Sequence, residues 1–493
     1  MAPKGQGRQL LKLSGKRTER RMRFLPISAF PPEYMCLHVL FLFLSGVERN
    51  LMLNLLNQID AFVWGPPLLI LLVGTGVYLT ARLGLLQITR LPQAFRLIFA
   101  KDEGKGDVSS FAALCTALAA TVGTGNIIGV ATAIKVGGPG ALFWMWMAAF
   151  FGMATKYAEG LLAIKYRTTD KNGAVAGGPM HYILLGMGSK WRPLAIFFAI
   201  AGVLVALLGI GTFTQVNSIT ESVQNTTSIS PAITATVLAV LVAIAVFGGL
   251  TSISKISTAV VPFMAIIYIL GTLTVIFLNI GKIPETLVLV LTSAFSPTAA
   301  VGGFAGASIR MAIQNGVARG VFSNESGLGS APIAAAAAKT DEPVEQGLIS
   351  MTGTFIDTLI ICTLTGLTIL VTGVWSSDLN GVSLTQSAFS TVFSNFGSGL
   401  LTLFLVLFAF TTILGWNYYG ERCFEFLFGV RFIWLYRVIF VAMVLLGGFI
   451  ELDMVWIIAD IVNALMALPN LIALLALSPV IVAETRKYFA KHK

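Results

Sequence analysis

Charged side chains are scarce in this sequence of 493 residues: Asp, Glu, Lys and Arg together make up only 11% of it. A soluble domain carries about 25%, so a soluble protein of this size is excluded. Hydrophobic residues reach 56%, and several runs exceed the roughly 18 residues that mark a membrane-spanning helix. The composition predicts an all-α polytopic membrane protein.

Residues for catalysis and for the use of ATP are missing as well. The three His are scattered, and none has a Ser, Cys or acid at a useful spacing. The four Cys lie far apart, with no metal or redox spacing. No phosphate-binding loop of the Walker type occurs. We expect no enzyme activity, no ATP and no cofactor.

Positive charge is concentrated at the start of the chain. The net charge is +10, and residues 1–23 hold most of it, so the basic balance does not indicate nucleic-acid binding. Residues 34–46 are apolar but too short for an ordinary span. They are a signal-like segment, an extra short crossing, or part of an upstream stretch that is not native if translation begins at Met52. We favour the last, and treat 1–51 as an N-terminal extension, non-native or signal-like.

The hydrophobic runs predict about eleven transmembrane helices within a single domain, 52–490. They lie at 61–81, 110–134, 140–164, 193–216, 231–250, 258–280, within 286–320, and at 347–374, 398–418, 432–450 and 454–483. Basic and non-basic loops alternate, which predicts a cytoplasmic C-terminus. After one extra N-terminal helix at 61–81, the spans form two blocks of five, 110–280 and 286–483. Because five is odd, the blocks have opposite orientation, as the inverted repeats of secondary transporters do.

One predicted span contains residues that weaken a helix. The stretch TALAATVGTGNIIGVATAI (116–134) carries Gly123, Thr124, Gly125 and Asn126 near its middle. Unwound backbone is tolerated in a membrane where it lines a cavity or is buried in protein. Its carbonyls can then coordinate a cation, and a half-helix N-terminus can hold a carboxylate. The alternative is close helix packing through small residues.

Other polar residues lie at membrane depth. Gln215 in GTFTQVNS and Gln314 in RMAIQNG can bind an amino acid or make interhelical hydrogen bonds.

Intramembrane acids are functional candidates by default. Glu159 lies three residues from Lys156, which favours a structural pair, and Glu325 is expected to cap a short helix at 331–338. Asp357 is a candidate for a second ion or a proton.

Several longer motifs resemble the alanine or glycine:cation symporter family over residues 52–490. They are the stretch at 116–134 with GGPGALFWMWMAAFFG (137–152), ARGVFSNESGLGSAPIAAAAAKT (318–340), MTGTFIDTLIICT (351–363) and FAFTTILGWNYYGERCFEFLFG (408–429). The resemblance implies a fold similar to the leucine-transporter type, with ten core helices in two inverted repeats. It also implies Na⁺-driven transport of small neutral amino acids, chiefly alanine and glycine.

The resemblance also implies the site residues. Thr411 and Thr412 with carbonyls near Ala120 and Gly123 would hold Na⁺, although such hydroxyls also bond to the preceding helical turn. The substrate would contact Gly123, Thr124, Gly125, Asn126, Gln215 and Gln314. Trp416 lies one turn after Thr412 on the same helix face. It is either a wall of the substrate pocket that limits side-chain size or a packed or interfacial aromatic residue.

The sequence therefore predicts a Na⁺-coupled symporter of alanine and/or glycine in a bacterial plasma membrane, the inner membrane, working by alternating access. The alternative is an H⁺-coupled amino-acid transporter that uses Asp357. A channel and an intramembrane enzyme fit less well, because a channel would show no inverted repeat and an enzyme would need a nucleophile–base pair.

Overall fold

The computed structural model describes residues 46–101, 104–296, 309–449 and 452–492. The chain divides into two compact units, Met1–Leu55 and Leu56–Lys493. Residues 1–45 lie outside the described part, and with them almost all of the predicted extension 1–51 and of the apolar run 34–46.

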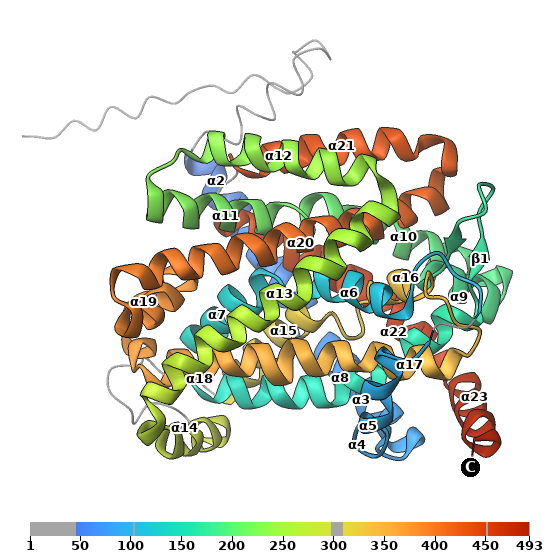
Figure 1. The fold of residues 1–493 in the computed structure, drawn as a ribbon, viewed down its shortest axis with the longest axis horizontal. Coiled ribbons are helices and arrows are strands. Elements are labelled where there is room, and N and C mark those ends of the chain that lie inside the picture. The colour runs from blue at the N-terminus through green and yellow to red at the C-terminus, as the bar shows by residue number, and fades with distance from the viewer. Residues whose placement is uncertain (1–45, 102–103, 297–308, 450–451, 493) are drawn as a thin grey trace, which may run out of the picture. The chain divides into compact units, whose positions relative to one another are not determined.

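Helices make up nearly all of the described chain (Figure 1). In the first half they are α2 (Gly46–Val63), α3 (Pro66–Leu83), α4 (Leu86–Thr89), α5 (Leu91–Ile98), α6 (Ser110–Thr121), the π-helix η3 (Gly125–Gly129), α7 (Val130–Gly137), α8 (Gly140–Lys165), α9 (Pro179–Tyr182), the π-helix η4 (Ile183–Met187), η5 (Ser189–Trp191), α10 (Arg192–Leu208), α11 (Phe213–Thr227), α12 (Pro231–Phe247) and α13 (Gly249–Leu278). A two-stranded antiparallel hairpin, β1 (Thr168–Thr169) and β2 (Val175–Ala176), follows α8, with Thr168 opposite Ala176.

The second half continues in the same manner. Its elements are η6 (Ile280–Lys282), α14 (Ile283–Phe295), α15 (Ile309–Asn324), α16 (Ala331–Ala335), α17 (Pro343–Thr354), the π-helix η8 (Phe355–Cys362), α18 (Thr363–Val371), η9 (Val374–Ser376), α19 (Gly381–Phe393), α20 (Asn395–Phe428), η10 (Val430–Phe432), α21 (Ile433–Gly447), α22 (Leu452–Ala476) and α23 (Ser478–Lys491).

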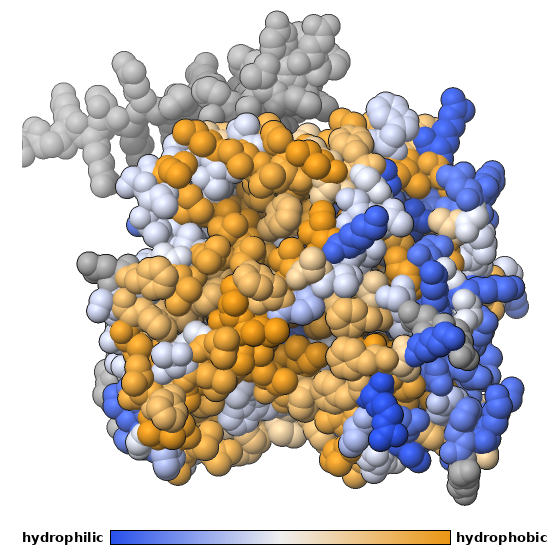
Figure 2. Space-filling view, viewed as in Figure 1, coloured by the Kyte–Doolittle hydropathy of each residue, from blue (hydrophilic) through white to orange (hydrophobic). Residues whose placement is uncertain are grey.

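Seven helical segments of the described residues are long and apolar enough to cross a bilayer, and an eighth if a bent pair of helices counts as one span. Their outward faces are apolar: Ile70 on α3 is 71% exposed and Phe277 on α13 is 70% exposed. Figure 2 shows hydrophobic residues over most of one face and hydrophilic ones gathered at the edge near β1 and α23. The chain is therefore a multi-pass membrane protein.

Small residues let the central helices approach closely, as is common in membrane bundles. A Cβ added at Gly347 on α17 would lie only 2.8 Å from the Tyr157 carbonyl on α8, and one at Gly160 only 2.7 Å from the Ser350 Cβ. Helices α8 and α17 consequently lie side by side, and α15 packs on α8 as well. In the same way α10 packs on α20 and α22.

The seven or eight candidate spans among the described residues are fewer than the eleven that the sequence predicts. Two of the predicted spans also differ in their outline. The span predicted at 193–216 is longer and interrupted, because α10 ends at Leu208 and α11 begins at Phe213. The poorly defined span within 286–320 contains two helices, α14 and the first part of α15, and residues 297–308 lie outside the described part.

Candidate functional site

The segment that the sequence predicts to unwind is broken. Helix α6 ends at Thr121, helical structure resumes at Gly125 as η3, and the two halves are bent by 52°. The weak helix propensity of Gly123 and Gly125 explains why the interruption falls here. All of these residues are buried.

The break frees two carbonyl groups of α6. The Gly123 N–H donates to the Asn126 Oδ1 at 2.8 Å, and the Thr124 N–H donates to the Gln215 Oε1 at 3.3 Å. In a continuous helix these N–H groups would bond to the carbonyls of Ala119 and Ala120. The Ala120 carbonyl therefore loses its helical donor beside the break, and can serve as a ligand.

Helix α20 packs directly on this break. The Thr412 hydroxyl donates to the Val122 carbonyl at 3.4 Å and to the Phe408 carbonyl at 3.0 Å. A Cβ at Gly123 would collide with the Thr412 hydroxyl, and one at Gly415 would lie 2.7 Å from the Ala120 Cβ. Thr412 therefore lies where a hydroxyl and freed carbonyls can surround a small cation.

Thr411 points toward another neighbour. Its hydroxyl bonds to the Phe408 carbonyl at 2.9 Å and reaches the Met264 Sδ of α13 at 3.5 Å. The hydroxyls of Thr411 and Thr412 thus both donate to a carbonyl of the preceding helical turn. This is the bonding that the sequence analysis gave as the alternative to a Na⁺ site. Of the two threonines, Thr412 is the one with a hydrogen bond to the broken segment.

A second break, between α10 and α11, adjoins the first. Gln215 on α11 accepts from the Thr124 N–H, and its Nε2 donates to the Ile210 carbonyl at 3.0 Å. This side chain therefore ties two unwound segments together. The sequence analysis missed the second break, although Gly209 and Gly211 in LLGIGTF signal it.

A third break separates α15 from α16. It begins at Glu325, a non-glycine residue with φ of 56°, a conformation that is unfavourable for a residue with a Cβ. A Cβ at Gly125 would lie 3.1 Å from the Ser323 Cα, so the first and third breaks are in contact.

Asp357 on η8 joins these two breaks. Its Oδ1 accepts from the Asn126 Nδ2 at 2.7 Å. Its Oδ2 accepts from the hydroxyls of Ser323 at 2.9 Å and Thr358 at 2.7 Å. Both polar atoms of the Asn126 amide are therefore hydrogen-bonded: its Nδ2 donates to Asp357, and its Oδ1 accepts from the Gly123 N–H. Asn126 therefore fixes the shape of the break.

Trp416 lies one turn beyond Thr412 and is fully buried. Its indole N–H donates to the Glu325 Oε1 at 2.8 Å, and the Ser330 hydroxyl donates to the Glu325 Oε2 at 2.5 Å. A Cβ at Gly211 would lie 2.8 Å from the Trp416 Cβ. The indole thus connects α20 with the second and third breaks. Glu325 reaches the start of α16 through a side-chain hydroxyl, whereas a capping carboxylate would bind backbone N–H groups.

The charges of Glu159 and Lys156 act on each other, but no hydrogen bond joins the two side chains. The Glu159 Oε1 accepts from the N–H groups of Gly327 and Gly329 and from the Asn470 Nδ2. The Lys156 ammonium is buried and has no hydrogen-bond partner among the described residues. Glu159 therefore stabilises the backbone of the third break. The sequence did not show this role, because the i, i+3 spacing of Glu159 from Lys156 indicated a pair within one helix.

Gln314 is placed elsewhere. It lies nine residues before Ser323 on α15, which is about 14 Å along a helix. Its Nε2 reaches the Trp64 carbonyl at 3.5 Å. The structure does not bring Gln314 to the three breaks.

One polar atom at the convergence of the breaks is unsatisfied. The Thr124 hydroxyl is buried and has no hydrogen-bond partner among the described residues. Buried polar groups are almost always paired, so an unpaired one beside free carbonyls indicates a place for a polar ligand. No group of three or more His, Cys, Asp or Glu in the described part is arranged to hold a metal ion. The oxygen donors at the break are hydroxyls and carbonyls, which suit a hard monovalent cation.

One guanidinium ties the segment before α6 to the segment after α16 at the hydrophilic end of the bundle. Arg167 is mostly buried, with a side-chain exposure of 12%. Its N–H groups donate to four backbone carbonyls, those of Lys105, Ala336, Ala338 and Thr340, at 2.7–3.0 Å.

Discontinuous membrane helices whose unwound segments meet inside the bundle are typical of secondary transporters. The fold agrees with that class: the structure of MhsT in complex with L-phenylalanine aligns with a TM-score of 0.55 and 12% identity, over 78% of this chain and 99% of that one. Transporters of the leucine-transporter fold share this architecture.

The chain belongs to the sodium:alanine symporter family, whose family model matches residues 49–493. It is 51% identical to the sodium/alanine symporter AgcS of Methanococcus maripaludis over 444 residues, 88% of this chain and 97% of the relative. It is 58% identical to an uncharacterized transporter of Haemophilus influenzae over 443 residues, 89% of this chain and 97% of the relative. The protein is thus a transporter and not an enzyme, and Na⁺-coupled amino-acid symport is the activity of its family.

Proposed function

We propose that this protein carries alanine and/or glycine into the cell with Na⁺, by alternating access. The observation that carries the proposal is the contact of the Thr412 hydroxyl with the broken end of α6. A hydroxyl from one repeat and freed carbonyls from the other meet there, so an ion bound between them would hold the two repeats together.

The Na⁺ site consists of the hydroxyls of Thr411 and Thr412 and the carbonyls of Ala120 and Gly123. The loss of the helical donor to Ala120 and the close approach of Thr412 to Gly123 support these ligands. Thr411 needs a rotation of its side chain away from Met264 to join them.

The substrate site lies around Gly123, Thr124, Gly125 and Asn126, with Gln215 and Trp416 beside it. The unpaired Thr124 hydroxyl is the group best placed to bind a carboxylate or an ammonium. Gly125 lies against Ser323, which leaves little space and favours a substrate with a small side chain. We assign Gln314 to helix packing.

Our proposal for the topology is a transporter domain at 52–490 with eleven helices across the bacterial inner membrane. Two inverted repeats, 110–280 and 286–483, would follow the extra helix at 61–81. The basic loops and the basic end of α23 support a cytoplasmic C-terminus. The three breaks then lie within the bundle where its halves meet.

An H⁺-coupled transporter is the second candidate, because the carboxylate of Asp357 is buried where two breaks meet. The three hydrogen bonds of the Asp357 carboxylate favour a structural role, in which it holds the two breaks together, over a role as proton carrier.

Thr412→Val and Thr412→Ser separate the two functions. For the Na⁺ account, Val raises the Na⁺ concentration for half-maximal alanine uptake by at least about tenfold, since a bond to a charged group contributes roughly 1.5–3 kcal/mol. Ser keeps the hydroxyl and stays near the wild-type value. A Val variant with unchanged Na⁺ dependence would contradict the site.

A further inference from the structure

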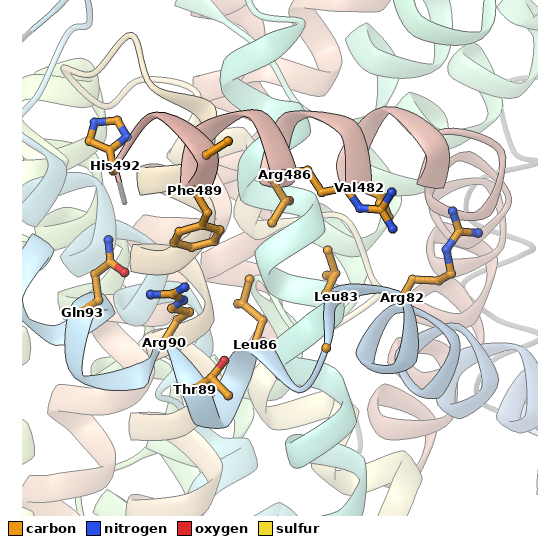
Figure 3. A pocket seen from close by; sticks show the side chains of 13 residues that line it. Arg82, Leu83, Leu86, Thr89, Arg90, Gln93, Val482, Arg486, Phe489 and His492 are labelled. Atoms are coloured by element: carbon orange, nitrogen blue, oxygen red, sulfur yellow. The ribbon is translucent and has the colours of Figure 1, made fainter.

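A cavity lies between α23 and the segment that joins α3 to α5. Its volume is about 600 Å³, and Figure 3 shows the thirteen side chains that line it. Three of them are arginines: Arg82 at the end of α3, Arg90 before α5 and Arg486 on α23. None of the thirteen is acidic.

The three guanidiniums have no carboxylate partner among the described residues. Arg82 donates to the Tyr78 hydroxyl at 2.6 Å, and Arg90 lies 4.1 Å from the centre of the Phe489 ring. Neither contact neutralises the charge. The nearby Glu484 is already paired, at 2.7 Å, with Lys165. The cavity therefore concentrates about three positive charges with no anion of the protein to balance them.

The chemistry of the lining fits a phosphate group. Guanidinium groups bind phosphate oxygens through two parallel N–H donors, more specifically than ammonium groups do. Thr89, Gln93 and His492 add neutral or weakly basic donors to the same cavity.

The surroundings distinguish a lipid from a free phosphate. Leu85 and Ile88, which lie in the sequence between Arg82 and Arg90, are 47% and 57% exposed. Exposed aliphatic side chains beside arginines, next to membrane helices, are typical of the interface where headgroups meet acyl chains. A phospholipid would use both features, whereas a soluble phosphate would use only the arginines.

We propose that this cavity binds the phosphate headgroup of an anionic phospholipid of the leaflet that α23 faces. The bound lipid bridges the C-terminal end of α3 to α23, the last helix of the chain. The inference is independent of the substrate and of the coupling ion.

The test compares the full chain with the triple variant Arg82→Gln, Arg90→Gln, Arg486→Gln by native mass spectrometry in mild detergent. Each protein is titrated with phosphatidylglycerol, with phosphatidylcholine and with glycerol 3-phosphate. The matched control replaces three exposed basic residues outside the cavity, Lys190, Arg192 and Lys282, by Gln.

We expect wild type and control to retain phosphatidylglycerol in preference to phosphatidylcholine. The triple variant should retain it less, by about fivefold for each arginine removed. If the triple variant is poorly folded, the single variants Arg90→Gln and Arg486→Gln should each show a loss of about fivefold. Equal retention by variant and wild type would overturn the proposal. Binding of glycerol 3-phosphate as strong as that of phosphatidylglycerol would overturn the lipid as the ligand.

Discussion

Gly123→Ala tests the contact between the broken helix and α20. The added Cβ would collide with the Thr412 hydroxyl and lie 3.3 Å from the Gln215 Oε1, so both groups must move. Overpacking of this kind costs about 1–3 kcal/mol. If the displaced hydroxyl is a ligand of Na⁺, the same energy is lost from ion binding. The Na⁺ concentration for half-maximal alanine uptake should then rise about 5- to 150-fold.

Gly129→Ala is the matched control, because a Cβ there meets nothing within 4 Å. Its backbone is helical, with φ of −60°, so Ala is favourable at this position. The assay is uptake of radiolabelled alanine into proteoliposomes over a range of Na⁺ concentrations. A Gly123→Ala protein with the Na⁺ dependence of the Gly129→Ala protein would refute the reasoning.

Three further variants test other contacts. In Asp357→Asn, the new amide still offers an oxygen to Asn126 and can donate to the two hydroxyl partners, so alanine uptake should fall less than about tenfold. Asp357→Leu removes these hydrogen bonds and should nearly abolish uptake. Loss of all uptake in the Asn variant would favour H⁺ coupling. Glu325→Ala leaves the buried indole N–H of Trp416 unpaired and should lower the free energy of unfolding in detergent by about 1–3 kcal/mol, while Glu325→Gln should lower it much less. Arg167→Gln removes the donor to four backbone carbonyls and should speed amide hydrogen exchange in the segments before α6 and after α16; unchanged exchange would show that the tie does not hold them.

The first break was predictable because its cause is local. Two glycines and polar side chains in an apolar span weaken the helix whatever surrounds them, so Gly123 and Gly125 indicated the interruption in the sequence. The membrane-spanning character was equally accessible, since it depends on the length and composition of each run.

The network between the breaks was not predictable from spacing. Asp357 is 231 residues from Asn126, and the pattern around either residue does not show that they bond. The spacing of Glu159 and Lys156 indicated their charge interaction, but it did not show the hydrogen-bond partners of Glu159. Those partners come from the α15–α16 segment and from α22. Gln314 was chosen for its chemistry, and its position along α15 decided otherwise.

Na⁺-driven uptake of alanine is the central claim, and one measurement tests it directly. Purified protein in proteoliposomes receives radiolabelled L-alanine under an inward Na⁺ gradient or an inward K⁺ gradient at matched pH. The account predicts accumulation with Na⁺ alone, and competition by unlabelled glycine. Equal uptake under both gradients would contradict Na⁺ coupling.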